Sequence, residues 1–205
     1  MPIKNGQLAS SLFIRAFQFA FWGAAGFYFP FANVYYRTIG LSGTQIGLIG
    51  TLAALLAALG AVIWGLLHDR LGKSRLIFTG ICWGAIFLSG WLGQLRDYRL
   101  ILPVAALLSF FTGPAVSQMD SMTLKLLGPN HAAYGSYRVW GTIGFVITSA
   151  LAGFILQATS IHSIFIAFPL GLFVFWLVSM RLPDQTIYQG PSLLGGLRQM
   201  ARQPQ

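Results

Sequence analysis

Asp120 and Arg138 are charged residues of opposite sign that lie within or at the edge of long apolar stretches. An isolated charge near the centre of a bilayer costs about 2.5–3.5 kcal/mol, so such charges are tolerated where they pair or face water. Ser117 lies three residues before Asp120, on the same side of a helix. We expect an Asp120–Arg138 pair, with Ser117 nearby, to line a water-filled cavity. In the alternative, Arg138 extends to the membrane surface and Asp120 partners a loop cation.

A second group of charged residues and glycines lies in residues 65–75, between the second and third apolar stretches. The glycines allow a tight turn, and the cations favour the cytoplasmic surface of a membrane. An acidic residue at a helix end among cations is consistent with a conformational gate. The alternative is an ordinary basic cytoplasmic loop, which would carry the same positive charges. The residues of this gate motif are Gly65, Asp69, Arg70, Gly72, Lys73 and Arg75.

Other reactive side chains are few and scattered. The chain has four Asp, no Glu, one Cys, and three His that are far apart, so we expect no metal site, no cofactor and no enzymatic centre. Tyr28 lies in an aromatic stretch, and its hydroxyl makes it a candidate for the cavity wall, although packing is the commoner role for such aromatics. Most of the tryptophans, Trp22 among them, are expected near span ends or lipid faces.

The composition indicates which solvent surrounds these residues. Hydrophobic residues make up 56% of the chain and charged residues 8%, against about 25% charged in soluble domains. The net charge of +9 comes mainly from a shortage of acids, and the cations are dispersed rather than clustered as nucleic-acid binding requires. We therefore expect a lipid bilayer, and no nucleic acid, as the partner of this chain.

Six stretches are long and apolar enough to cross a bilayer as helices, and they lack the alternation of membrane strands. The expected fold is an all-α membrane bundle over residues 1–181, followed by a cytoplasmic linker at 182–205 that leads to a missing second half. The expected spans are 12–36, 44–67, 76–95, 100–126, 138–158 and 161–180.

The basic residues between the spans predict the orientation. Eight of them lie on the N-terminal side of the predicted bundle and three, Arg37, Arg96 and Arg99, on the opposite side. The positive-inside rule then places both termini in the cytoplasm and the chain in the cell membrane.

The gate motif resembles the G-x-x-x-D-R-x-G-[KR]-x-[RK] signature of the major facilitator superfamily. The resemblance implies a twelve-helix fold in two halves, of which this chain is the N-terminal one, built from 3+3 inverted repeats. It also implies that the motif latches one conformation by contact with the second half.

A second resemblance covers the fourth and fifth spans. Tyr134-Gly135-x-x-Arg138-x-Trp140-Gly141, together with Asp120, resembles the phenylpropionate-permease-like branch, which is related to the lactose-permease type within the MFS_1-like group. The resemblance implies that Asp120 and Arg138 bind the substrate. If Pro114 anchors the alignment with the sugar symporters, Ser117 takes the place of their acid and Asp120 follows one turn later, which fits the phenylpropionate-permease pattern better.

These resemblances imply a secondary active transporter that works by alternating access, most simply a proton symporter of a small organic solute. A sugar, an aromatic acid or a nucleoside would fit. The alternative is a non-transporting six-helix membrane component that assembles with another chain. A reading frame that continues for about six further spans would distinguish the first from the second.

Overall fold

The structure, a computed structural model, describes residues 5–71 and 74–181. Within these residues the chain is helical and contains no strand, and the predicted fold class of six membrane helices is confirmed. Two short 3-10 helices, η1 (His131–Ala133) and η2 (Ile161–Ser163), precede the last two long helices. The long helices are α1 (Asn5–Thr38), α2 (Gly43–Leu71), α3 (Ser74–Leu92), α4 (Tyr98–Leu127), α5 (Tyr134–Ala158) and α6 (Ile164–Met180).

The turn between α1 and α2 shows how local sequence ends one helix and starts the next. Gly40 has a φ of 87°, a conformation open to glycine, and it lets the amide of Leu41 donate to the carbonyl of Tyr36 at 3.0 Å. Ser42 and Gln45 then form a capping box: the Gln45 amide donates to Ser42 Oγ, and the Ser42 amide donates to Gln45 Oε1. The turn therefore satisfies backbone groups on both sides of it.

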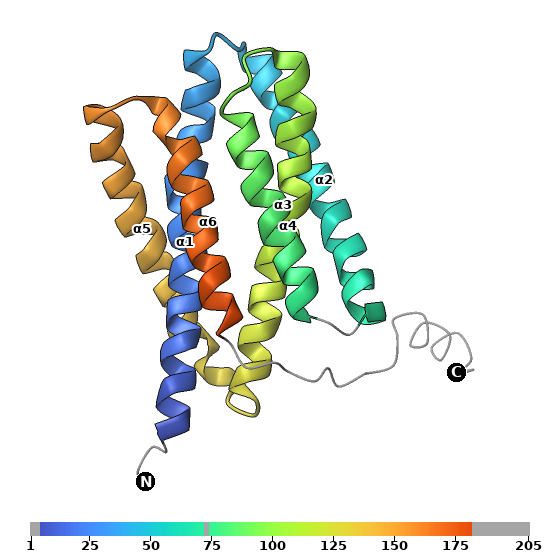
Figure 1. Cartoon of the computed structure of the whole chain (residues 1–205), viewed down its shortest axis with the longest axis vertical. Helices are drawn as coiled ribbons and strands as arrows, with labels where there is room; N and C mark the ends of the chain where they lie inside the picture. Colours follow the sequence, from blue (N-terminus) through green and yellow to red (C-terminus); the bar gives the residue numbers. More distant parts are fainter. Residues whose placement is uncertain (1–4, 72–73, 182–205) are drawn as a thin grey trace.

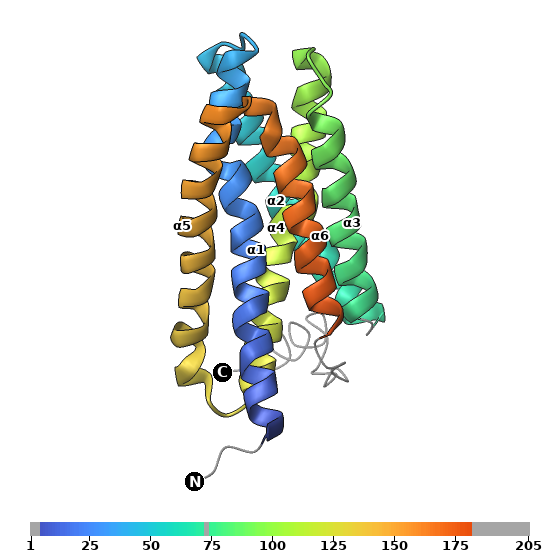
Figure 2. The same ribbon diagram turned by 60° about the vertical axis from the view of Figure 1, so that its left-hand side comes forward.

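The helices form two groups of three that are not consecutive in the chain. In Figures 1 and 2, α1 lies beside α5 and α6, and α4 lies beside α2 and α3. The two groups meet chiefly where α3 packs against α6. If α1, α2 and α3 are exchanged with α4, α5 and α6, the same pairs of helices remain in contact. This symmetry is what two repeats of three helices require.

Five of the six long helices in the described part of the chain are long and apolar enough to cross a membrane. The exception is α1, where Arg15, Gln18 and Asn33 interrupt the apolar sequence. Nevertheless α1 runs the length of the bundle between α5 and α6 and supplies buried core residues such as Phe17 and Tyr35. The described residues therefore form a multi-pass membrane bundle.

The helices α2 and α5 each leave a large apolar face exposed. On α2 only 11% of the most apolar segment is buried within the structure. On α5 the corresponding value is 22%, although α5 packs closely on α1 along its other face. The exposed apolar side chains include Leu48, Leu55, Leu59, Val62 and Ile63 on α2, and Val139, Val146, Ile147, Leu151 and Phe154 on α5.

Candidate functional site

A polar group forms where α4 meets the start of α5. Asp120 lies two turns before the end of α4, and Tyr134 and Arg138 lie one turn apart on one face of α5. The Tyr134 hydroxyl lies near enough to Asp120 and Arg138 to be influenced by the charge of both. One carboxylate oxygen of Asp120, Oδ1, is buried and has no hydrogen-bond partner among the described residues. The group thus retains an unused acceptor inside an apolar bundle.

The guanidinium of Arg138 lies over the indole ring of Trp22, with its Cζ atom 4.2 Å from the ring centroid. Trp22 is at the midpoint of α1, so the arginine side chain turns inward along the bundle. A cation over an indole face gains about 0.5–1 kcal/mol when exposed and about 2 kcal/mol or more when desolvated. The alternative in which Arg138 extends away to the membrane surface does not match this geometry.

The structure does not bring Asp120 and Arg138 into a direct ion pair, and their expected position at a water-filled cavity stays a prediction. Neither residue forms an ion pair within 4.0 Å in the part of the chain that the structure describes. The physical reason is that the Trp22 face holds the guanidinium, while the Tyr134 hydroxyl lies within reach of both charges. Asp120 and Arg138 therefore belong to a group of three residues on two helices, with Tyr134 as the third member and Trp22 of α1 in contact with Arg138.

Sequence reasoning missed both Tyr134 and Trp22. Tyr134 carried a usable signal, because its spacing of four residues from Arg138 places both side chains on one helix face. Trp22 was expected near a span end or a lipid face, and the structure instead places it at the centre of α1. No spacing along the chain could have paired it with a residue of the fifth span.

The contact between α1 and α4 adds a buried polar pair beside this group. Gln18 Nε2 donates to Thr123 Oγ1 at 3.2 Å, and both side chains are fully buried. Gln18 Oε1 and Trp22 Nε1 are buried without partners among the described residues. An unsatisfied buried polar group costs about 1–3 kcal/mol, so a water or solute that paired with these atoms would bind favourably.

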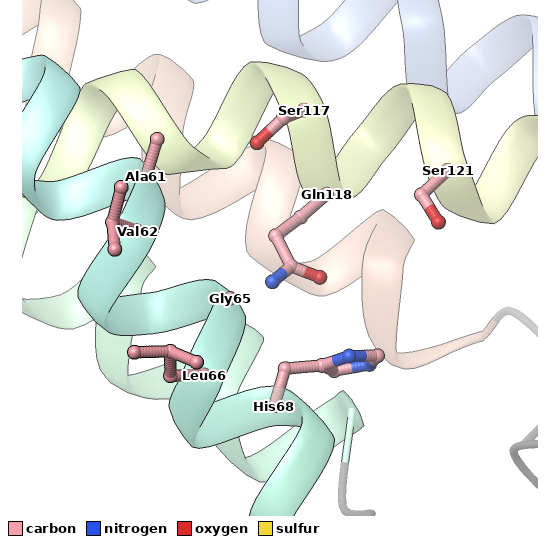
Figure 3. A pocket seen from close by; sticks show the side chains of 8 residues that line it. All are labelled: Ala61, Val62, Gly65, Leu66, His68, Ser117, Gln118 and Ser121. Atoms are coloured by element: carbon pink, nitrogen blue, oxygen red, sulfur yellow. The ribbon is translucent and has the colours of Figure 1, made fainter. Parts of the chain in front are cut away.

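Ser117 lies apart from the polar group, in a groove of about 310 Å³ between α2 and α4. Figure 3 shows Ser117, Gln118 and Ser121 on the α4 wall, with Gln118 extending toward Gly65 and His68 of α2. The Ser117 hydroxyl donates to the carbonyl of Pro114 at 3.0 Å within its own helix. Ser117 therefore lines a neighbouring groove rather than the space around Asp120.

Tyr28 does not line a cavity, which corrects its expected placement. Its side chain is only 7% exposed and stacks on Phe168 of α6 with ring centroids 4.7 Å apart. Its hydroxyl lies 3.4 Å from that of Tyr36 on the same helix. The Tyr28 hydroxyl therefore has another core tyrosine as its polar partner, rather than water in a cavity.

The gate motif lies mostly at the end of α2. Gly65 borders the groove of Figure 3, and Arg70 and Arg75 are exposed on either side of the α2–α3 connection. The backbone of Asp69 belongs to the last turn of α2. Gly72, Lys73 and the predicted linker at 182–205 lie outside the described residues.

A second groove, of about 720 Å³, lies between α3 and α6 and is far more apolar. The amide of Gln94 and the indole N–H of Trp91 are the polar side-chain groups among its lining residues. No cluster of three metal-binding side chains occurs within residues 5–71 and 74–181, and Cys82 is a buried free thiol. The Asp120–Tyr134–Arg138 group is thus the arrangement best suited to bind a polar solute.

Comparison with known families gives the wider context. A family model described as the MFS_1 like family matches residues 12–192, nearly the whole chain. The chain belongs to the MFS_1 like family. The predicted resemblance to this branch of the major facilitator superfamily is confirmed.

Similar proteins carry transporter names. A maltose permease of Geobacillus stearothermophilus is 29% identical over 185 residues, which is 88% of this chain and 46% of that protein. A sucrose permease of Escherichia coli is 27% identical over 154 residues, which is 72% of this chain and 37% of that protein. This MFS_1 like chain therefore spans about half the length of the curated relatives it matches.

The fold has a close counterpart among solved structures. A mutant of the nucleoside transporter NupG superposes with a TM-score of 0.75 at 18% sequence identity, over 94% of this chain and 50% of that structure. At this identity the likeness establishes the fold alone. The six helices correspond in extent to one half of that protein.

Proposed function

We propose that this MFS_1 like chain forms one half of a secondary transporter that carries a small organic solute across a membrane by alternating access. The observation that carries the proposal is the Asp120–Tyr134–Arg138 group, which retains a buried unpaired carboxylate oxygen within an apolar bundle. Charged groups at such positions are costly and are typical of solute or ion pathways. The permease names of the relatives support transport rather than enzymatic catalysis.

A second six-helix half would cover the apolar faces of α2 and α5. These faces are much larger than the scattered apolar residues of an ordinary protein surface, which supports an interaction with further helices as well as with lipid. The half-length match to the relatives is consistent with this arrangement. Rocking of the two halves would then expose the polar group to each side of the membrane in turn.

The chemistry of the group supports a solute that offers both hydrogen-bond donors and acceptors. Arg138 supplies donors, and the unpaired oxygen of Asp120 accepts. A sugar satisfies both and is our first candidate, because two relatives are named for sugars. A nucleoside or an aromatic acid would use the same arginine and could stack on nearby aromatic rings.

The test is uptake of labelled maltose, sucrose, uridine and phenylpropionate into vesicles that contain the protein expressed from its complete gene. We expect one of these solutes to accumulate, and to accumulate more when a proton gradient is imposed. Asp120→Asn and Arg138→Gln should each reduce uptake efficiency roughly ten- to hundredfold, since a hydrogen bond to a charged group contributes about 1.5–3 kcal/mol. If uptake remained intact in both variants, Asp120 and Arg138 would be excluded as the solute-binding site.

We further propose that the gate motif acts at the cytoplasmic side and that protons are the coupling ion. The grouping of Arg70 and Arg75 at the α2–α3 connection supports the first statement, because cations favour the cytoplasmic surface. The second depends on the uptake experiment: accumulation that ignores the proton gradient would contradict it. If none of the solutes is carried, a non-transporting component that assembles with another chain becomes the better account.

A further inference from the structure

The contact between Arg138 and Trp22 is closer than the other arginine contacts with aromatic rings in the described residues. Arg15 lies 5.6 Å from the ring centroid of Tyr137 and 5.7 Å from that of Trp140, whereas Arg138 lies 4.2 Å from that of Trp22. Trp140 is also an exposed residue, while Trp22 is partly buried between helices. The two indoles thus make the same kind of contact in different surroundings.

Gly141 provides the space in which the Arg138–Trp22 contact forms. A Cβ atom at Gly141 would lie 2.5 Å from Trp22 Cδ1 and 2.8 Å from Arg138 Nη1. One turn away, a Cβ atom at Gly144 would lie 2.5 Å from the carbonyl oxygen of Phe19. The close approach of α1 and α5 at this level therefore depends on glycines of α5.

A contact with the face of an indole ring leaves the hydrogen-bonding capacity of the guanidinium free. The indole ring attracts the cation through its π electrons and offers no hydrogen-bond acceptor, so it does not pair with the five N–H donors as a carboxylate would. No ion pair with Asp120 fixes the guanidinium within the described residues, and Tyr134 is the one neutral hydroxyl that the structure places near it. The indole face can therefore fix the orientation of Arg138 without using the donors that a solute needs.

We propose that Trp22, given room by Gly141, is a positioning residue that holds the Arg138 guanidinium flat with its donors directed toward the space beside Asp120 and Tyr134. This inference rests on the proposed function, in which Arg138 binds the solute. It also makes a prediction about the orientation and accessibility of Arg138 that requires no solute.

The test is the rate at which phenylglyoxal modifies Arg138 in vesicles that contain the protein expressed from its complete gene, measured by peptide mass spectrometry. The exposed Arg37, at the far end of α1, serves as the internal reference. Trp22→Leu should raise the relative rate at Arg138 roughly five- to tenfold, because the stacking contact is lost. Trp22→Phe retains a ring face and should stay within about twofold of the unchanged protein.

Trp140→Leu is the matched control, since it removes an indole from the other arginine contact between the same two helices. It should leave the rate at Arg138 unchanged. Gly141→Ala should raise the modification rate of Arg138 as Trp22→Leu does. If the Gly141→Ala protein is not produced in the membrane, the two Trp22 variants alone test the proposal. An unchanged rate in Trp22→Leu, or equal rates in the leucine and phenylalanine variants, would overturn the proposal.

Uptake kinetics provide a second readout that separates positioning from general damage. For a solute carried in the uptake panel, Trp22→Leu should raise KM more than it lowers the maximal rate, and Trp22→Phe should restore KM. A fall in the maximal rate alone would contradict positioning. If no solute of the panel is carried, the proposed function fails, while the modification rates still decide whether Trp22 orients Arg138.

Discussion

At the scale of single residues, the centre of the bundle contains polar atoms that apolar packing alone would exclude. Gln18 and Thr123 are fully buried and satisfy one another only in part, because Gln18 Oε1 has no partner in the described region. In a low-dielectric interior a hydrogen bond is stronger and an unpaired polar atom is more costly, so the Gln18–Thr123 contact between α1 and α4 carries energetic weight.

Thr123→Val tests the energetic weight of this pair. The substitution leaves the amide group of Gln18 buried without its hydroxyl partner, so the free energy of unfolding should fall by about 1–3 kcal/mol. The measurement is denaturant unfolding in detergent micelles. Adding Gln18→Leu removes the stranded amide, and the double variant should be more stable than Thr123→Val alone.

Thr51→Val is the control for that experiment, because the Thr51 hydroxyl donates only to the carbonyl of Gly47 on an exposed part of α2. Its effect on stability should be within about 0.5 kcal/mol. Equal losses for Thr51→Val and Thr123→Val would show that the buried pair has no special weight.

Glycine substitutions on α5 test the close approach of α1 and α5. A Cβ atom at Gly144 would lie 2.5 Å from backbone oxygen, whereas a Cβ atom at Gly153 would meet nothing within 4 Å. Gly144→Ala should therefore destabilise the protein by about 1–3 kcal/mol through overpacking. Gly153→Ala should be neutral or stabilising by about 0.5–1 kcal/mol in the same unfolding measurement, because alanine favours a helix. Equal effects of the two variants would contradict the close contact.

At the scale of the helices, the start of α4 is defined by a short polar signal that is independent of the apolar pattern. Asp97 precedes α4, and its carboxylate accepts a hydrogen bond from the amide of Arg99 at 2.9 Å. Such a cap satisfies an amide that has no partner within the helix, and its negative charge is favourable at a helix N-terminus. The position of α4 matters functionally because this helix carries Asp120.

Asp97→Ala should cost about 1 kcal/mol of stability, the usual effect of losing an N-cap. Asp97→Asn retains a side-chain oxygen and should lose much less. Both are measured by thermal unfolding in detergent, and a loss in the asparagine variant as large as that in the alanine variant would assign the effect to charge rather than to capping. Neither substitution should alter the modification rate of Arg138, because Asp97 lies at the opposite end of α4.

At the scale of the whole molecule, arginines mark both ends of the bundle. Arg70, Arg75 and Arg181 lie at the end where α1 begins, and Arg37, Arg96 and Arg99 lie at the other. The sequence places eight basic residues on the first side against three on the second, counting residues outside the described part. The positive-inside rule predicts that the first end is cytoplasmic.

Cysteine labelling of intact cells tests this orientation. In a background in which Cys82 and any other cysteine are replaced, Arg37→Cys should react with a membrane-impermeant maleimide and Arg181→Cys should not. After the cells are opened, both should react, because both positions are exposed. Reaction of the Arg181 variant in intact cells would reverse the proposed topology.

The sequence alone was enough to predict that lipid surrounds the chain, that it forms six long helices and which family it resembles. These follow from properties of contiguous segments: the length and hydropathy of each span, and local signals such as the gate motif. Asp120 and Arg138 also stood out as candidates, because a charged residue inside an apolar stretch can be recognised without knowing its neighbours in space.

Only the tertiary structure decided which helix faces meet. It placed Arg138 on Trp22, Tyr134 near both charges, Ser117 in a neighbouring groove and Tyr28 in the core. The rotation of a helix about its axis is set by close contacts such as those at Gly141 and Gly144, which join segments far apart in the chain. Hydropathy along one segment contains no information about that rotation when the segment is apolar on all sides.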